Sequence, residues 1–253
     1  MTTLKIEPNG PAEAQIQATL VLLFKRPLIG QGKQRLAATL GVDAACHLAE
    51  GFLNCALEDL NHWPGPVVLA PASESDRGWA QQLPVDADVV PQVDGNLGQR
   101  ILCLDQHLMD LGHPQRIYIG SDAPMLTPQH YYQVGRQLLE TDVVLSAADD
   151  GGVTIMATGS AWPEALIGLP WSTDQLGQAL ALSCQQSGQQ VSYVESGYDI
   201  DIESDLVRLS TDLMTDSRPA RQQLLQRLET LLKTSASGES VSPIKQVEPA
   251  AEF

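Results

Sequence analysis

Carboxylates that directly follow predicted strands are the residues of this chain best suited to chemistry. Residues 116–124 read RIYIGSDAP, in which three apolar residues of strand preference precede a Gly-Ser pair and the carboxylate of Asp122. Pro124 ends the strand, because it has no N–H and biases the preceding residue towards an extended conformation. Further along, Asp199 and Asp201 point the same way if their segment is extended. Acids from two loops make a hard oxygen site, so we expect Asp122, Asp199 and Asp201 to bind Mg²⁺ or Mn²⁺.

Each of these acids also has a structural interpretation. Asp122 is equally suited to capping a turn, and Asp201 or Ser204 is suited to capping the helix that follows. The acidic, glycine-containing segment 149–152 adds a further flexible turn, for which a plain hairpin is the alternative.

A basic loop follows the first predicted strand and carries four bases within eleven residues, 25–35. Glycines allow the backbone to approach a ligand closely, and basic side chains bind phosphate oxygens. The spacing is not that of a Walker A loop, and the structural alternative is an ordinary solvated basic turn. The candidate phosphate-binding residues of this loop are Lys25, Arg26, Gly30, Gly32, Lys33 and Arg35.

A second candidate phosphate-binding segment is residues 94–100, where a Gly-Asn turn leads into a helix that begins near Gly98. Helix N-termini favour anions, and Arg100 adds a cation to the same segment. Such turns are common before helices, so this segment alone is a weak signal. We assign Asn96, Gly98 and Arg100 to nucleotide binding because the other loops also point to it.

These loops are placed by an alternation of strands and helices. The pattern predicts an α/β protein, a Rossmann-like three-layer α/β/α sandwich with a mostly parallel central sheet. In such sheets ligands bind at the carboxyl ends of the strands, where the loops described above should converge. Strands are expected at 18–24, 67–70, 88–92, 117–119, 142–147, 153–157 and 191–194, and helices at 43–60, 75–82, 97–111, 127–140, 173–187 and from 219.

Composition and charge narrow the possible partners. The formal net charge of the 253 residues is −16, from 31 acids and 15 bases, so a nucleic-acid backbone is an unsuitable partner. A phosphate ligand bridged by a metal is compatible with this charge, because the ion supplies positive charge locally. The four cysteines lie far apart, which argues against disulfides and a zinc site and favours a reducing, cytoplasmic location.

The domain boundaries are expected near the two ends of the chain. We predict an N-terminal arm at 1–16, one domain at 17–233 and a disordered tail at 234–253, where few residues can be buried. The first apolar run, 18–24, is too short to span a membrane and has the wrong flanks for a signal peptide, so no membrane span is expected.

Taken together, the motifs resemble those of the DUF2064 family, some of whose members are labelled arsenosugar-biosynthesis glycosyltransferases. The family is similar to the broader nucleotide-diphospho-sugar transferases, which include molybdenum-cofactor and phospholactate guanylyltransferases. The resemblance covers about residues 18–210, and the order of the motifs is more specific than any one of them. The matching segments are 24–36, 95–100, 120–124, 150–152, 170–173 and 199–201.

This resemblance implies a GT-A fold that binds a nucleotide through a divalent metal. It implies that Asp122 and one of Asp199 and Asp201 hold the metal, and that Lys33 and Arg35 contact the phosphates. Two departures, Val153-Thr154 and Ile202-Glu203, concern the acceptor pocket more than the metal site. The residues that the resemblance places near the acceptor or sugar are Asp150, Gly151, Gly152, Trp171, Ser172 and Thr173.

We therefore expect a metal-dependent transferase that uses a nucleotide-sugar and a small-molecule acceptor, with Asp122, Lys33 and Arg35 as its catalytic residues. The first alternative is a nucleotidyltransferase that uses a nucleoside triphosphate, because the same residues stabilise either leaving group. The second is a non-catalytic nucleotide-binding or scaffold protein that offers the leucine-rich last helix to a partner. The sequence does not indicate an oligomeric state.

Overall fold

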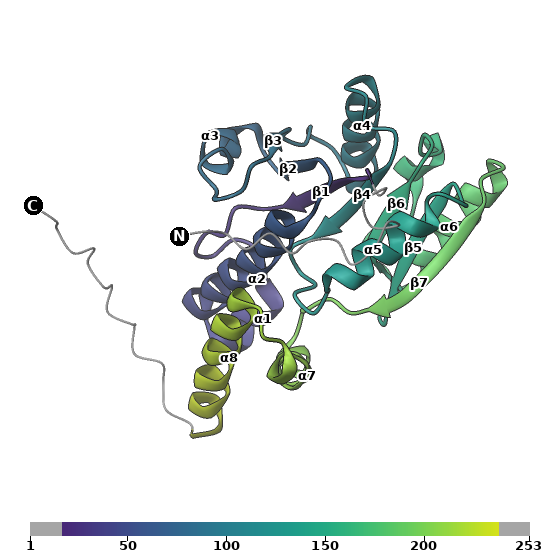
Figure 1. The fold of residues 1–253 in the computed structure, drawn as a ribbon. Coiled ribbons are helices and arrows are strands. Elements are labelled where there is room, and N and C mark those ends of the chain that lie inside the picture. Colours follow the sequence, from purple (N-terminus) through teal and green to yellow (C-terminus); the bar gives the residue numbers. More distant parts are fainter. Residues whose placement is uncertain (1–16, 238–253) are drawn as a thin grey trace, which may run out of the picture.

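The structure, a computed structural model, describes residues 17–237. Its strands form one seven-stranded sheet in the order β3-β2-β1-β4-β6-β5-β7 (Figure 1). All pairs are parallel except those of β6, which runs antiparallel to β4 and β5. The predicted mostly parallel α/β fold is therefore confirmed. The strands are β1 Thr19–Phe24, β2 Val67–Pro71, β3 Asp88–Val89, β4 Arg116–Gly120, β5 Val143–Ala148, β6 Val153–Thr158 and β7 Val191–Gly197.

Helices lie on both faces of the sheet (Figure 1). Leu20 and Leu22 of β1 point into a core with α2 and α5, whereas Val21 points into a second core with α4 and α6. This alternation is expected of a strand that is covered on both faces. The helices are α1 Gln34–Leu40, α2 Val42–His62, α3 Arg77–Ala80, α4 Leu97–Asp110, α5 Pro128–Gln137, α6 Leu176–Gln186, α7 Glu203–Asp212 and α8 Pro219–Ser237, with short 3-10 turns η2 Glu74–Asp76, η3 Glu164–Gly168 and η4 Leu213–Thr215.

Two elements differ from the prediction. The first helix is preceded by a short helix, α1, which is separated from α2 by Gly41 with a positive φ of 86°. Glycine adopts this conformation without strain, so the chain can change direction there. The third strand, β3, has only two residues and pairs with β2 at the edge of the sheet, although Val90 N and Gln92 N of the predicted strand still donate to β2.

The last helix packs against the domain. Leu224 and Leu228 of α8 are buried in a third core, together with residues of α1, α2 and α7. Leu224 and Leu228 are thus covered within the chain and are not available to a partner, whereas Leu225, Leu231 and Leu232 of the same stripe are partly buried. The helix continues to Ser237, beyond the predicted boundary at 233. The predicted arm at 1–16 and the rest of the predicted tail lie outside the described residues.

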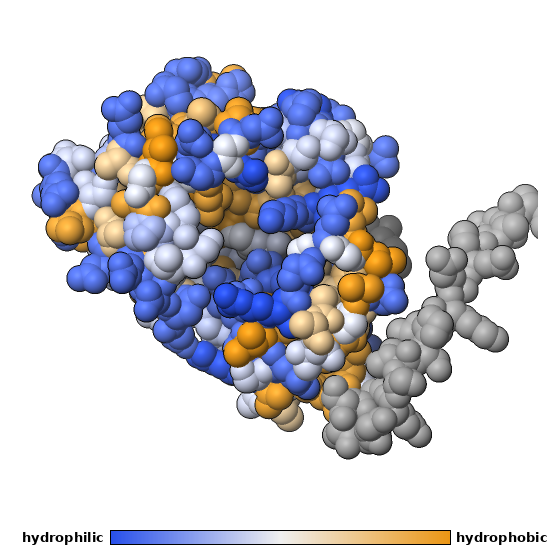
Figure 2. All heavy atoms as spheres, turned by 180° about the vertical axis from the view of Figure 1, so that it is seen from behind, coloured by the Kyte–Doolittle hydropathy of each residue, from blue (hydrophilic) through white to orange (hydrophobic). Residues whose placement is uncertain are grey.

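One face of the molecule is mainly hydrophilic. On the face shown in Figure 2, hydrophilic side chains predominate and apolar ones gather in several separate patches. Within residues 17–237, no helix has the length and apolar character needed to cross a membrane.

The topology brings the predicted loops to one edge of the sheet. β1 is parallel to β4, and because β6 is antiparallel to both β4 and β5, the strands β5 and β7 run in the same direction as β4. The carboxyl ends of β1, β4, β5 and β7 therefore share one edge, which we call the carboxyl edge.

Candidate functional site

Lys33 lies at the centre of an acidic cluster on the carboxyl edge. Its Nζ is 3.0 Å from Oδ2 of Asp122 and 3.7 Å from Oδ1 of Asp201, and it donates to the carbonyl oxygen of Ile200 at 2.6 Å. The Lys33 side chain is only 8% exposed, whereas about half of each carboxylate side chain is exposed. The loops after β1, β4 and β7 thus meet at one ammonium group, as the parallel topology predicts.

Asp199 belongs to the same cluster and is mostly buried. Its pKa is raised from 3.8 to about 7, mainly by burial and also by the nearby carboxylates of Asp122 and Asp150, although Lys33 acts to lower it. A buried carboxylate with acidic neighbours disfavours its own ionised form. Strongly shifted groups of this kind gather at functional sites because a ligand supplies the missing charge.

The raised pKa of Asp199 makes stability depend on pH. Between about pH 4 and pH 7 Asp199 keeps its proton in the folded protein but loses it in the unfolded chain. Its contribution to stability is therefore fully present below about pH 4 and is lost as the pH rises through 7. Without metal, the free energy of unfolding relative to Asp199→Asn should fall by about 3 kcal/mol from pH 5 to pH 8. Urea titrations of both proteins in EDTA test this; a constant difference between them would contradict it.

Asp201 faces the cluster and does not cap the following helix. Its carboxylate lies 3.4 Å from Nη1 of Arg35, in addition to its contact with Lys33. The backbone N–H groups of Asp201 and Ile202 instead donate to the carboxylate of Asp205, both at 2.9 Å. The capping alternative for Asp201 is therefore wrong, because Asp205 satisfies the backbone at the start of α7.

The turn after β5, part of the predicted segment 149–152, is joined to α7 by Arg208, which the sequence did not identify. Asp149 forms an ion pair with Arg208 of α7, and the Arg208 guanidinium carbon lies 3.7 Å from the centre of the Tyr198 ring. Tyr198 directly precedes Asp199, so these contacts join the turn to the acidic segment. Only the position of Tyr198, beside the acidic pair, offered a clue in the sequence.

Backbone strain is found at two predicted site residues. Lys33 has a φ of 44° and Ser172 a φ of 63°, and within residues 17–237 they are the only non-glycine residues with positive φ. Left-handed backbone is unfavourable for residues with a Cβ and persists mainly at ligand-binding and catalytic sites. Both residues lie in loops that were assigned to the site on sequence grounds.

The rest of the basic loop does not converge on the cluster. Arg26 lies 3.9 Å from Asp76 and 5.1 Å from the centre of the Trp79 ring, while Lys25 is exposed. Gly30 and Gly32 have positive φ of 76° and 70°, so they shape the loop. Of the candidate bases, Lys33 and Arg35 are the ones that contact the acids.

The candidate residues at the start of α4 serve local structure. Asn96 caps the helix by accepting from Gln99 N at 2.9 Å, and it also donates to Ile167 O at 3.0 Å. Arg100 Nε donates to Gly95 O at 2.8 Å. A Cβ on Gly98 would lie 2.2 Å from Leu166 O, so this glycine allows α4 to pack against η3.

The close packing of Gly98 makes a testable prediction about stability. Gly98→Ala should lower the free energy of unfolding by about 1–3 kcal/mol, because the contact at 2.2 Å is with backbone and cannot relax by side-chain rotation. Gly78→Ala is the matched control, since its Cβ would meet nothing within 4 Å, and it should stabilise α3 by about 0.5–1 kcal/mol. Urea unfolding measures both, and equal effects would contradict the packing explanation.

The predicted acceptor residues form a compact contact. A Cβ on Gly151 would lie 1.9 Å from Asp174 O, and Gly177 N donates to Gly151 O at 2.9 Å. The turn 150–152 therefore packs on the segment 170–177. Trp171 Nε1 donates to Leu166 O at 3.0 Å, and Thr173 Oγ1 donates to Pro170 O at 2.7 Å.

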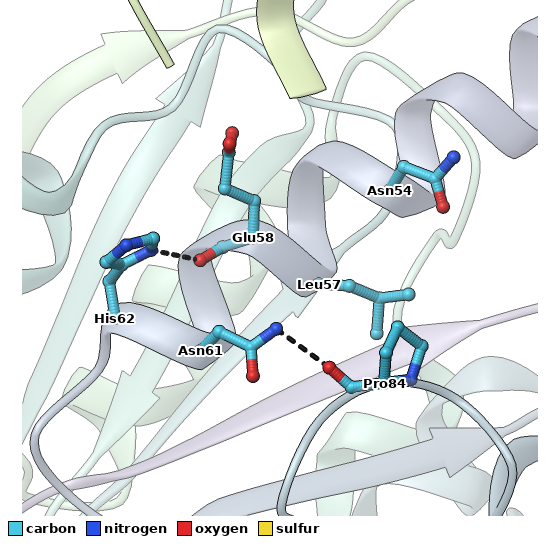
Figure 3. A pocket seen from close by; sticks show the side chains of 6 residues that line it. All are labelled: Asn54, Leu57, Glu58, Asn61, His62 and Pro84. Carbon is cyan, nitrogen blue, oxygen red and sulfur yellow. Dashed lines mark hydrogen bonds between the residues drawn. The ribbon is translucent and has the colours of Figure 1, made fainter. Parts of the chain in front are cut away.

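A cavity of about 460 Å³ lies elsewhere (Figure 3). It lies at the C-terminal end of α2. Because β2 begins directly after this helix, the cavity is at the edge of the sheet opposite the carboxyl edge. Asn61 donates to Pro84 O, and the His62 ring contacts Glu58 O within the same helix. None of the predicted site residues lines it. The lining residues are Asn54, Leu57, Glu58, Asn61, His62 and Pro84.

The donor atoms of the cluster are compatible in type with a divalent metal. Carboxylate oxygens such as those of Asp122, Asp199 and Asp201 are the ligands that Mg²⁺ and Mn²⁺ prefer. Burial and the neighbouring carboxylates raise the pKa of Asp199 despite the nearby Lys33, so a bound cation would favour its ionised form. In the described part of the chain, no group of three or more His, Cys, Asp or Glu side chains is already arranged around a metal position.

Comparison with known proteins supports the family resemblance. Residues 55–173, just under half of the chain, match the family described as "Uncharacterized protein conserved in bacteria (DUF2064)". The predicted resemblance is confirmed for this segment. The DUF2064 segment contains Asp122 and Asp150, whereas Lys33, Asp199 and Asp201 lie outside it. No protein with a curated function matches the chain significantly.

Solved structures confirm the fold. A "putative nucleotide-diphospho-sugar transferase" from Desulfovibrio desulfuricans G20 is 21% identical, with a TM-score of 0.77 over 86% of this chain and 97% of that chain. A cytidylyltransferase from Leptospira borgpetersenii serovar Hardjo-bovis (strain JB197) is 10% identical, with a TM-score of 0.49 over 91% of this chain and 99% of that chain. The similarity to the first of these structures establishes a GT-A-like fold for this chain, and at 21% identity it establishes the fold alone.

Proposed function

We propose that this protein is a metal-dependent glycosyltransferase that transfers a sugar from a nucleotide donor to a small-molecule acceptor. The observation that carries the proposal is the convergence of Lys33, Asp122 and Asp201 at the carboxyl edge, with Nζ–carboxylate distances of 3.0 and 3.7 Å. Ligands of open α/β sheets bind at this edge. Residues 17–233 are proposed to act as one catalytic domain, in the cytoplasm, where free cysteines such as Cys103 stay reduced.

The proposed donor site divides into acids and bases. Asp122, with Asp199 and Asp201, would hold Mg²⁺ or Mn²⁺, which when bound supplies positive charge to the donor phosphates. Lys33 and Arg35 would contact the same phosphates. Both bases already contact a carboxylate, so an anionic ligand would exchange one charge-assisted interaction for another.

In the proposed reaction an acceptor nucleophile forms a bond to the anomeric carbon of the sugar. The bond between this carbon and the phosphate oxygen breaks, and its electron pair leaves with the nucleoside diphosphate. Lys33 and Arg35 stabilise the charge that develops on this leaving group, and the buried Lys33 is already held in position before the reaction begins. The acceptor would lie towards the turn 150–152 and the segment 171–173.

A thermal-shift panel of nucleoside diphosphates, triphosphates and nucleotide-sugars, each with and without Mn²⁺, tests the proposal. A donor present at about 100 times its Kd should stabilise the protein by about 2.7 kcal/mol, and only with the metal. Product analysis then separates two reactions, since glycosyl transfer releases a nucleoside diphosphate and nucleotidyl transfer releases pyrophosphate. Failure of every nucleotide to stabilise the protein in the presence of Mn²⁺ would refute the proposal.

A further inference from the structure

Two arginines at the start of α8, Arg218 just before the helix and Arg221 in its first turn, contact the loop that follows Asp122. Arg221 Nε donates to Pro124 O at 3.1 Å, and its Nη2 donates to Leu126 O at 3.3 Å. Arg218 Nη2 donates to the same Leu126 oxygen at 2.8 Å. The arginines lie 92 to 97 residues from these carbonyl groups in the sequence, so the contacts depend on the docking of α8.

The two guanidinium groups are themselves held in place. Arg221 Nη2 and Arg218 Nη1 contact the two oxygens of Asp59 in α2, at 2.6 and 2.7 Å. Tyr131 of α5 donates to Asp59 at 2.8 Å. The side chain of Arg221 is completely buried and that of Asp59 is 2% exposed. Three helices therefore fix the position of the donors that reach the loop.

The ion pairs of Arg218 and Arg221 with Asp59 are better explained by a role in holding the loop in place than by a contribution to the stability of the protein. Buried ion pairs are often no more stabilising than well-packed apolar residues of similar volume. The arginine donors, however, satisfy the carbonyl oxygens of Pro124 and Leu126, which belong to buried residues and need partners. An apolar side chain at position 221 would remove the donor to Pro124 O, and one at either position would remove a donor to Leu126 O.

The contacts bear directly on Asp122. Only Ala123 separates Asp122 from Pro124, and the carbonyl oxygen of Asp122 accepts from Ile200 N at 3.1 Å. The loop is therefore held on one side by the segment that carries Asp199 and Asp201, and on the other by the arginines. Between these attachments the direction of the Asp122 side chain is restricted.

We propose that Arg218 and Arg221 are positioning residues that order the loop 121–127 and thereby orient Asp122 for metal binding. The second part rests on the proposed function, whereas the ordering of the loop does not. Because the DUF2064 segment ends at residue 173, the proposal gives a role to a helix outside it.

Arg218→Gln tests the proposal, with Arg227→Gln, further along in α8, as its matched control. Arg227 donates to His47 O of α2 at 3.0 Å, so the control also loses a contact between α8 and α2 but none with the loop. Backbone hydrogen exchange of residues 121–127 and Mn²⁺ affinity by electron paramagnetic resonance are the two readouts. Both are measured well below the melting temperature of each variant.

Arg218→Gln should speed exchange in the loop about tenfold and weaken Mn²⁺ binding about 10–100-fold. Arg227→Gln should change neither, and Arg218→Lys, which keeps one donor in reach, should recover part of both. Unchanged exchange in Arg218→Gln, or equal changes in the two glutamine variants, would overturn the proposal. If the unaltered protein binds no Mn²⁺, the metal-dependent function fails, and the exchange data alone decide whether the arginines order the loop.

Discussion

Asp122→Asn should abolish metal-dependent nucleotide binding while leaving the protein folded. The substitution removes the carboxylate that we assign as the principal metal ligand. Mn²⁺ affinity should therefore fall by more than about 100-fold, which exceeds the loss typical when a residue that only contacts a metal ligand is replaced. The lost pair with Lys33 is half exposed on the Asp122 side, and such pairs contribute about 0–1 kcal/mol. Removal of one like charge near Asp199 offsets this loss.

Calorimetric titration with Mn²⁺ and melting curves without metal provide the measurement. Asp110→Asn is a suitable control, since Asp110 ends α4 just before β4 begins, at the edge opposite the site. The Asp122 variant should melt close to the unaltered protein without metal and show no added stabilisation with Mn²⁺ and nucleotide. Full retention of metal-dependent stabilisation would remove Asp122 from the site.

Lys33→Met should have the second largest effect, this time on the nucleotide. A charge-assisted hydrogen bond is worth about 1.5–3 kcal/mol, so loss of the ammonium group should weaken nucleotide binding about 10–100-fold. Metal binding without nucleotide should persist or strengthen, because the substitution removes the positive charge of Lys33 that lies 3.0 Å from the carboxylate of Asp122. The substitution is therefore expected to weaken nucleotide binding without weakening metal binding.

Lys25→Met is the matched control for this prediction. Lys25 lies in the same basic loop but is exposed, and Lys33 is the base that contacts the acids. Titrations of nucleotide at saturating Mn²⁺ should show less than about a threefold change for Lys25→Met, as expected for a screened surface charge. A larger loss for Lys25→Met than for Lys33→Met would place the phosphates elsewhere on the loop.

The proximity of Lys33, Asp122 and Asp201 could be predicted from the sequence because it depends on topology. Each residue follows a strand, and parallel strands place their carboxyl ends at one edge, whatever the details of side-chain packing. The same reasoning applies to Asp150, which follows β5. The alternation of predicted strands and helices was therefore sufficient to bring these candidate residues to one edge of the sheet.

Side-chain partners could not be predicted in this way. Arg26 and Lys33 lie in one loop, yet Arg26 lies near Asp76 and Trp79 whereas Lys33 contacts Asp122. Gly98 was assigned to a ligand, although its close contact with Leu166 shows why a side chain does not fit there. Such choices depend on which segments approach each other in three dimensions, and local sequence patterns do not contain that information.

The arginines of α8 illustrate the same limit. The sequence shows a leucine stripe, which predicts a buried helix face, but it does not show that Arg221 will be buried with it. A buried arginine is uncommon unless it is paired, and its partner Asp59 lies on a helix far away in the chain.

Anomalous diffraction at the manganese edge, from crystals grown with MnCl₂ and a nucleoside diphosphate, tests the central claim most directly. We expect one strong peak at the carboxyl edge, from a manganese ion that is coordinated by Asp122 and by Asp199 or Asp201. The phosphate oxygens of the nucleotide should contact Lys33 or Arg35. A manganese peak away from Asp122, or a nucleotide bound at another surface such as the cavity beside α2, would contradict it.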